Sequence, residues 1–150
     1  MSGAIGGLDA LRAAREGGLT EGTLITSKPP KALAGAPFFR DHPVDLAALR
    51  ASTVIFDGCA SDAIHLVPSN VNIAALVSLA GIRPRRTRTR VIADPMSERN
   101  VHQPVARGRF GELRVELRNV ASGANPKTSH LAWLSLIAAI EQRDEPVRAG

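Results

Sequence analysis

The pattern of apolar and polar positions predicts strands and helices in mixed order. Residues 8–16 carry apolar side chains at helical spacing, and Gly17-Gly18 ends this predicted helix. Residues 23–27 alternate in the manner of a strand, and Pro29-Pro30 then fixes the backbone of the following loop. Residues 53–56 form a continuous apolar run of strand length, which predicts a buried strand.

The rest of the chain continues this alternation. Residues 32–43 have no clear period and are expected to be irregular, whereas residues 44–51 predict a short helix with Asp45 near its start. The periodicity also predicts helices over 60–67, 73–80 and 129–142 and strands over 87–93, 101–106 and 113–120. The helix over 73–80 is apolar on nearly all sides, so we expect it at the centre of the fold.

These elements predict one α/β (α+β) domain, a mixed sheet of about five strands covered by helices on one face. Residues 1–142 are expected to form the domain and residues 143–150 a charged tail. The predicted strands over 53–56 and 113–120 carry enough apolar side chains to leave an apolar surface on the uncovered face. We therefore expect this face to be a subunit interface in a homo-oligomer.

The composition is that of one globular domain. The chain has 150 residues, of which 44% are apolar and 22% charged, and this length can hold a core without disulfides or metals. Its single cysteine, Cys59, forms no internal disulfide, which fits a reducing compartment. No apolar stretch is long enough for a membrane span, and the first residues lack the pattern of a signal peptide. We therefore expect a cytoplasmic protein without a membrane partner.

The net charge of +5 has a local origin. Removing Arg83, Arg85, Arg86, Arg88 and Arg90 leaves 14 basic residues against 14 acidic ones. Proteins that bind single-stranded nucleic acid add aromatic stacking platforms to such charges, and only 3% of this chain is aromatic. We interpret the run as a solvated strand face, with an anionic ligand or a subunit contact as the alternative, and expect no nucleic-acid partner.

His102 is the candidate for acid–base chemistry. A polar turn over 94–100, containing carboxylates and an arginine, leads directly into the strand that carries it, and these neighbours would set its pKa. The alternative is a structural or exposed histidine. Asp94 could orient the imidazole ring or simply cap the turn. The histidines, Cys59 and the carboxylates form no recognisable ligand spacing, so we expect no metal site.

Two segments near helix starts are candidates for cofactor contacts. Residues 3–7 form a glycine-rich loop before a helix, which could approach a flat or anionic ligand closely, although a flexible chain start is the alternative. The loop does not match G-x-G-x-x-G and follows no strand, so it fails as a dinucleotide fingerprint. Asn70 and Asn72 flank another helix entrance, where they could cap the helix, contact a ligand, or both.

The three lysines are candidates for holding a carboxylate. Lys127 precedes Thr128 and Ser129, either of which could cap the last helix, and such a positive helix entrance favours a carboxylate. Lys28 and Lys31 bracket two prolines. Solvated loop charge is the usual interpretation of lysines in such polar loops.

Six segments together resemble the L-aspartate dehydrogenase family, in the family's order and over about residues 2 to 140. They are residues 2–10, 26–30, 56–58, 68–75, 93–102 (without 96–98) and 125–129. The resemblance implies a fold like the C-terminal domain of dihydrodipicolinate reductase. It also implies NAD- or NADP-dependent oxidation of L-aspartate to iminoaspartate, which hydrolyses to oxaloacetate and ammonia or enters NAD biosynthesis.

The resemblance also implies roles for particular residues. His102 matches the family's catalytic histidine, which would accept a proton from the substrate ammonium group or activate the water that attacks the imine. The implied contacts to the dinucleotide are Ala4, Asn72 and Asn70. We expect one substrate carboxylate to bind at Lys127, Thr128 and Ser129, and consider Lys28 or Arg99 for the other.

The sequence departs from the family in one large respect. The strand, glycine loop and acidic ribose ligand of a Rossmann half are not among these residues, and they would occupy about a hundred further residues upstream. This leaves an alternative to the enzyme. The chain could be a non-catalytic fragment or remnant that keeps the fold and the oligomer interface but cannot bind a dinucleotide alone.

Overall fold

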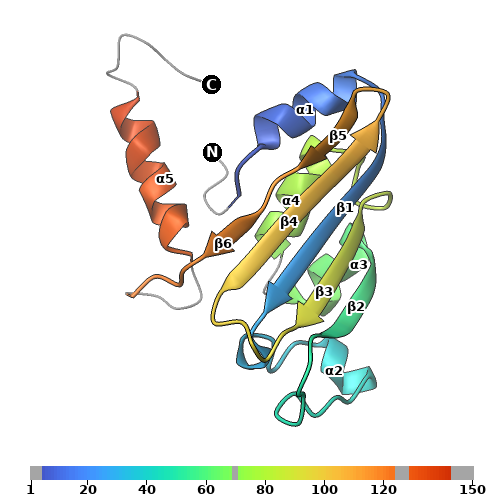
Figure 1. Ribbon diagram of the computed structural model, residues 1–150, viewed down its shortest axis with the longest axis vertical. Coiled ribbons are helices and arrows are strands. Elements are labelled where there is room, and N and C mark those ends of the chain that lie inside the picture. The colour runs from blue at the N-terminus through green and yellow to red at the C-terminus, as the bar shows by residue number, and fades with distance from the viewer. Residues whose placement is uncertain (1–4, 69–70, 124–128, 143–150) are drawn as a thin grey trace.

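The computed structural model describes residues 5–68, 71–123 and 129–142 (Figure 1). Its strands are β1 (Leu19–Lys28), β2 (Thr53–Cys59), β3 (Arg88–Ala93), β4 (Asn100–Gly108), β5 (Gly111–Arg114) and β6 (Leu117–Asn119). Its helices are α1 (Leu8–Glu16), the 3-10 turn η1 (Pro30–Ala32), α2 (Phe38–Asp41), α3 (Ala60–Leu66), α4 (Val71–Ala80) and α5 (His130–Glu141). The helices predicted over 8–16, 60–67, 73–80 and 129–142 are thereby confirmed, within a residue or two at each end.

The strands form one mixed sheet with β1 at its centre. The order is β2-β3-β1-β4-β5, and β6 pairs with β4 beside β5. Strand β1 runs parallel to β3 and antiparallel to β4. Helices α1, α3 and α4 cover one face, and Figure 1 views the sheet from its uncovered face. The predicted mixed sheet with helices on one face is therefore confirmed.

The core lies between this sheet and its helices. Leu24 of β1 and Ala106 of β4 pack against Leu11 of α1 and against Ile73 and Val77 of α4. Helix α4 has buried side chains along most of its length, as expected from its apolar sequence. Because strand side chains alternate between faces, every second residue of β1, from Leu24 to Lys28, points into this core.

Residues 44–51 do not form the predicted helix. The Asp45 carboxylate accepts hydrogen bonds from the backbone N–H groups of Ala47 (3.0 Å) and Ala48 (3.2 Å), which closes a turn locally. These are the hydrogen bonds of a helix N-cap, but the backbone forms only a turn here. Conversely, the segment expected to be irregular contains the short helix α2.

Two predicted strands differ in detail. The run over 53–56 belongs to β2, an edge strand with Val54 51% exposed, and is thus not buried on both faces. The stretch over 113–120 is split into β5 and β6, although both continue one register along β4. Val115 N–H donates to Pro104 O (3.1 Å), but Pro104 has no N–H to return the bond, so the ladder is interrupted there.

Helix α5 stands away from the sheet in Figure 1 and buries none of its side chains. Although it is apolar, it is too short to cross a bilayer, and the same holds for every other helix of the described residues.

Candidate functional site

Three polar side chains from two paired strands lie on the helix-covered face of the sheet, which also buries the hydroxyl of Thr89. Thr26 and Lys28 come from β1, and His102 comes from β4, where the register places it opposite Thr26. Thr26 is fully buried, His102 is 3% exposed and Lys28 is 5% exposed. We call these three residues the polar cluster. Buried polar groups are uncommon unless they are paired or used, so the polar cluster is the candidate functional site.

Thr26 fixes the orientation of the histidine ring. Its Oγ1 lies 3.1 Å from Nδ1 of His102, within a buried environment. This contact leaves Nε2 as the ring nitrogen available for chemistry. Asp94, which the sequence offered for this role, instead accepts a hydrogen bond from Met96 N–H (3.0 Å) and caps the turn. Thr26 belongs to one of the segments that carry the family resemblance, but its contact with His102 could not be predicted because it depends on strand register.

The electrostatics of the polar cluster keep the imidazole neutral. Burial, and secondarily the positive charge of Lys28, lower the pKa of His102 to about 4. The expected influence of the polar turn before His102 was therefore wrong. Burial also lowers the pKa of Lys28 to about 8, which leaves it mostly protonated at neutral pH. The interpretation of Lys28 as a solvated loop charge was wrong as well, because it ends the central strand and faces the core.

The structure places two further candidates outside this cluster. Ser129 occupies the N-cap position of α5 but makes no capping hydrogen bond, and its Oγ is buried without a partner among the described residues. Asn72 lies exposed in the first turn of α4. The remaining expected contacts, Ala4, Asn70, Lys127 and Thr128, fall outside the described residues.

The described end of the glycine-rich loop has a structural role. Gly7 adopts φ 74° at the N-cap of α1. A Cβ at this position would come within 2.8 Å of Val115 Cγ2. Both the backbone conformation and the close approach of Val115, which lies between β5 and β6, therefore require glycine at position 7.

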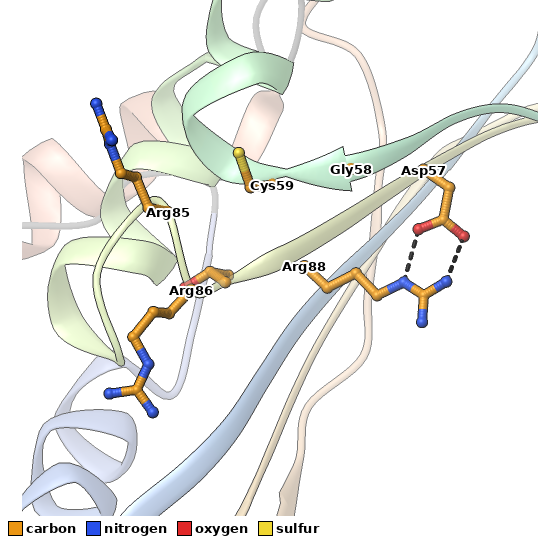
Figure 2. Close-up of a pocket in the computed structure, with 7 residues that line it drawn as sticks. Asp57, Gly58, Cys59, Arg85, Arg86 and Arg88 are labelled. Carbon is orange, nitrogen blue, oxygen red and sulfur yellow. Dashed lines mark hydrogen bonds and ion pairs between the residues drawn. The ribbon is translucent and has the colours of Figure 1, made fainter.

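An open groove of about 560 Å³ lies away from the polar cluster, between the end of β2 and the start of β3 (Figure 2). Its guanidinium groups diverge: Arg85 and Arg86 point away from each other, and Arg88 reaches along the strand to Asp57. Arg88 and Arg90 both bind the Asp57 carboxylate, the former through two bonds of 2.6 and 2.8 Å, and lower the pKa of Asp57 to about 2. The groove therefore does not focus its charges on one ligand position.

The arginine run is arranged largely as expected. Arg88 and Arg90 lie on the uncovered face of β3, whereas Arg86 belongs to the turn before that strand. Within the described ranges, no three or more His, Cys, Asp or Glu side chains are grouped to hold a metal ion. The polar cluster is thus the site with the best-defined chemistry.

Comparisons with known proteins agree with the mixed α/β fold described above. The family described as "Aspartate dehydrogenase, C-terminal" matches residues 9–143. The L-aspartate dehydrogenase of Methanosarcina acetivorans is 46% identical over 149 residues, and that of Cupriavidus necator is 47% identical over 147 residues. These matches cover 99% and 98% of this chain but only 55% and 54% of the relatives.

A solved structure also matches nearly all of this chain but only about half of its own length. The crystal structure of aspartate dehydrogenase from Thermotoga maritima superposes with a TM-score of 0.77 at 26% identity, over 99% of this chain and 54% of that one. The chain thus spans about half the length of the proteins it matches. Because the family match extends over most of its residues, the chain belongs to the aspartate dehydrogenase family and corresponds to its C-terminal part.

Proposed function

We propose that this chain is the substrate-binding half of an NAD- or NADP-dependent L-aspartate dehydrogenase. The relatives that cover nearly all of this chain carry the name L-aspartate dehydrogenase. The observation that carries the proposal is the buried imidazole of His102, held by Thr26 with one ring nitrogen left for the substrate. A neutral imidazole in a water-poor site suits proton transfer during amine oxidation.

In the proposed reaction, the bond between the substrate Cα and its hydrogen breaks, and the hydrogen leaves with both electrons as hydride. A bound pyridine nucleotide supplies the acceptor for that hydride. His102 Nε2 takes a proton from the substrate nitrogen, so that the nitrogen lone pair forms the C=N bond of iminoaspartate. For Nε2 to accept this proton, Nδ1 carries the ring hydrogen and donates it to Thr26 Oγ1. Once Nε2 has released this proton to solvent, it can take a proton from the water that attacks the imine carbon, and the resulting carbinolamine breaks down to oxaloacetate and ammonia.

The described residues fit only part of a dinucleotide. Asn72 presents an exposed side chain at the start of α4, where its amide could bind the cofactor together with Asn70 and Ala4. No G-x-G-x-x-G segment for the pyrophosphate occurs in the 150 residues. We therefore assign these three residues to one end of the cofactor and the phosphate contacts to a separate dinucleotide-binding half.

Ser129 supports the proposed carboxylate site at the start of α5. Its buried Oγ, which has no partner among the described residues, could donate a hydrogen bond to a substrate oxygen. Lys127 and Thr128 precede it directly in the sequence and would add a positive charge and a second hydroxyl.

We also propose that a second copy of the chain covers the open face of the sheet. Val54 is exposed there, and Ile25, Ile92 and Val101 line an open hollow of about 310 Å³ on the same face together with polar side chains such as Gln103 and Arg118. Protein surfaces that bind a second copy combine apolar and polar side chains in this way. Oligomerisation without catalysis remains the second candidate function, because this face needs nothing from the polar cluster.

The decisive experiment joins residues 1–150 to the upstream dinucleotide-binding half of the Methanosarcina acetivorans relative. We expect this protein to reduce NAD or NADP with L-aspartate, which absorbance of the reduced nucleotide measures for each cofactor. His102→Ala should lower kcat at least about 100-fold, the usual contribution of a general base. His65→Ala, at an exposed histidine of α3, is the matched control and should retain activity. Equal activity of the two variants would remove His102 from the reaction, whereas a folded joined protein without aspartate-dependent reduction would favour the non-catalytic candidate.

A further inference from the structure

The turn between α4 and β3 carries positive charge that the chain does not neutralise. Three exposed residues of this segment form what we call the arginine turn: Arg83, Arg85 and Arg86. Their side chains have no ion pair and no hydrogen bond with any residue that the structure describes. Asp57, the acidic residue lining the adjacent groove, is already bound by Arg88 and Arg90. The charge of the arginine turn is therefore free for a partner.

Hydrogen bonds hold the backbone of the arginine turn in one conformation. Arg83 N–H donates to Ser78 O (2.9 Å), which ties the turn to the last part of α4. Arg83 O accepts hydrogen bonds from Arg86 N–H (3.1 Å) and from both the N–H and the hydroxyl of Thr87 (3.0 and 2.9 Å). The arginine side chains thus project from a fixed backbone.

The conformation of Arg83 is itself unusual. Its φ is 81°, and within residues 5–68, 71–123 and 129–142 it is the one residue other than glycine with a positive φ. A side chain with a Cβ adopts this conformation at a cost in free energy. Such residues are concentrated at ligand-binding and switch sites, where the surrounding structure holds them in place.

The directions of the arginine side chains indicate the shape of the ligand. Figure 2 shows Arg85 and Arg86 leaving the turn in opposite directions, so a single phosphate or carboxylate does not meet both guanidinium groups. Successive side chains of an extended polypeptide also point to opposite sides. Two acidic residues in succession on an extended segment can therefore each pair with one arginine.

The opposite wall of the groove also suits a polypeptide. Gly58 and Cys59 of β2 form this wall, and β2 is an edge strand that pairs with β3 alone among the described strands. The free edge of a strand offers backbone N–H and C=O groups to an extended segment. The described residues that line the groove include no aromatic side chain on which a nucleic-acid base could stack.

We propose that the arginine turn and the adjacent edge of β2 bind an extended acidic segment of a partner protein. The arginines supply charge-assisted hydrogen bonds to successive carboxylates, and the strand edge supplies bonds to the backbone of the segment. This surface lies away from the polar cluster, so the proposal does not depend on the dehydrogenase function.

The test measures binding of the 150-residue chain to fluorescently labelled octaglutamate by anisotropy at low salt. Replacing Arg85 and Arg86 together by alanine should weaken binding about 3- to 30-fold, the range for loss of two exposed ion pairs. The matched control replaces Arg12 and Arg40, exposed arginines of α1 and α2, by alanine. It removes the same charge and should bind like the unchanged chain. Affinity in the unchanged chain should fall as salt is added.

NMR of the backbone amides locates the bound peptide. Octaglutamate should shift the signals of residues 57–59 and 83–87. The proposal is overturned if octaglutamate does not bind at low salt, if the two double variants bind it equally, or if the shifts lie elsewhere. Tighter binding of a single-stranded DNA oligonucleotide through Arg85 and Arg86 would assign the surface to nucleic acid and would also overturn it.

Discussion

Apolar side chains are usually buried and polar ones exposed, and strand β1 and helix α5 break this rule in opposite ways. β1 directs Thr26 and Lys28 into the core, whereas α5 exposes large apolar side chains: Leu131, Trp133, Leu134, Leu136, Ile137 and Ile140. The neighbours explain the contrast. β1 is paired on both edges and covered by helices, so the alternation of the strand decides which side chains are buried. Buried polar groups are common at functional sites, and large exposed apolar surfaces are common where another molecule binds.

The largest expected difference between the two regions is in stability. Leu24→Ala, at a fully buried position of β1, should lower the free energy of unfolding by about 2–5 kcal/mol through lost burial and a cavity. Leu136→Ala, at a position 55% exposed in α5, should change it by less than about 0.5 kcal/mol. Urea unfolding at one protein concentration measures both. Equal losses would show that α5 is packed as firmly as β1.

The polar cluster should also make stability depend on pH. The folded chain binds a proton at His102 only near pH 4, whereas an unfolded histidine does so near its ordinary value of 6.5. Acid thus favours the unfolded chain, and stability should fall by about 3 kcal/mol between pH 6.5 and 4, at about 1.4 kcal/mol per pKa unit.

Thermal or urea unfolding over this pH range tests the assignment. His102→Gln should remove most of the dependence. His130→Gln, at the exposed histidine that begins α5, should leave it in place. If both variants keep the same slope, another group is responsible.

The smallest expected effect is the difference in stability between substitutions at two buried threonines of the sheet. Thr26→Val deprives His102 Nδ1 of its partner and should cost about 1–3 kcal/mol, the usual penalty for a buried group left without a hydrogen bond. The Thr89 hydroxyl has no partner among the described residues, so Thr89→Val should be neutral or slightly stabilising. Calorimetric melting of the two variants measures the difference. A costly Thr89→Val would mean that burial alone, and not the contact with His102, makes Thr26 important.

Local patterns predicted much of this fold. Helices α1, α3 and α4 were found because their apolar residues recur at helical spacing and glycine or proline marks their ends. The turn at Asp45 was mistaken for a helix start because its carboxylate accepts the hydrogen bonds of a helix N-cap, although only a turn follows.

The candidate site was only partly predictable. His102 could be singled out from its turn and from the family resemblance, but its partners could not. Thr26 lies 76 residues away in the chain and meets His102 only because β1 and β4 pair in one particular register. The burial of Lys28 likewise depends on which strand is central, and no local pattern reports this.

The irregularity in β2 has a consequence for how this strand can change during evolution. The register with β3 shifts between Val54 and Phe56, so that Ile55 and Phe56 are both buried in succession and Asp57 emerges on the face of Arg88 and Arg90. The extra residue places two adjacent side chains on the core face, while Val54 and Asp57 keep the faces that a regular strand would give them. Deleting Ile55 would therefore leave Asp57 opposite Arg90 and remove one core side chain, so this strand can lose a residue without exchanging its two faces.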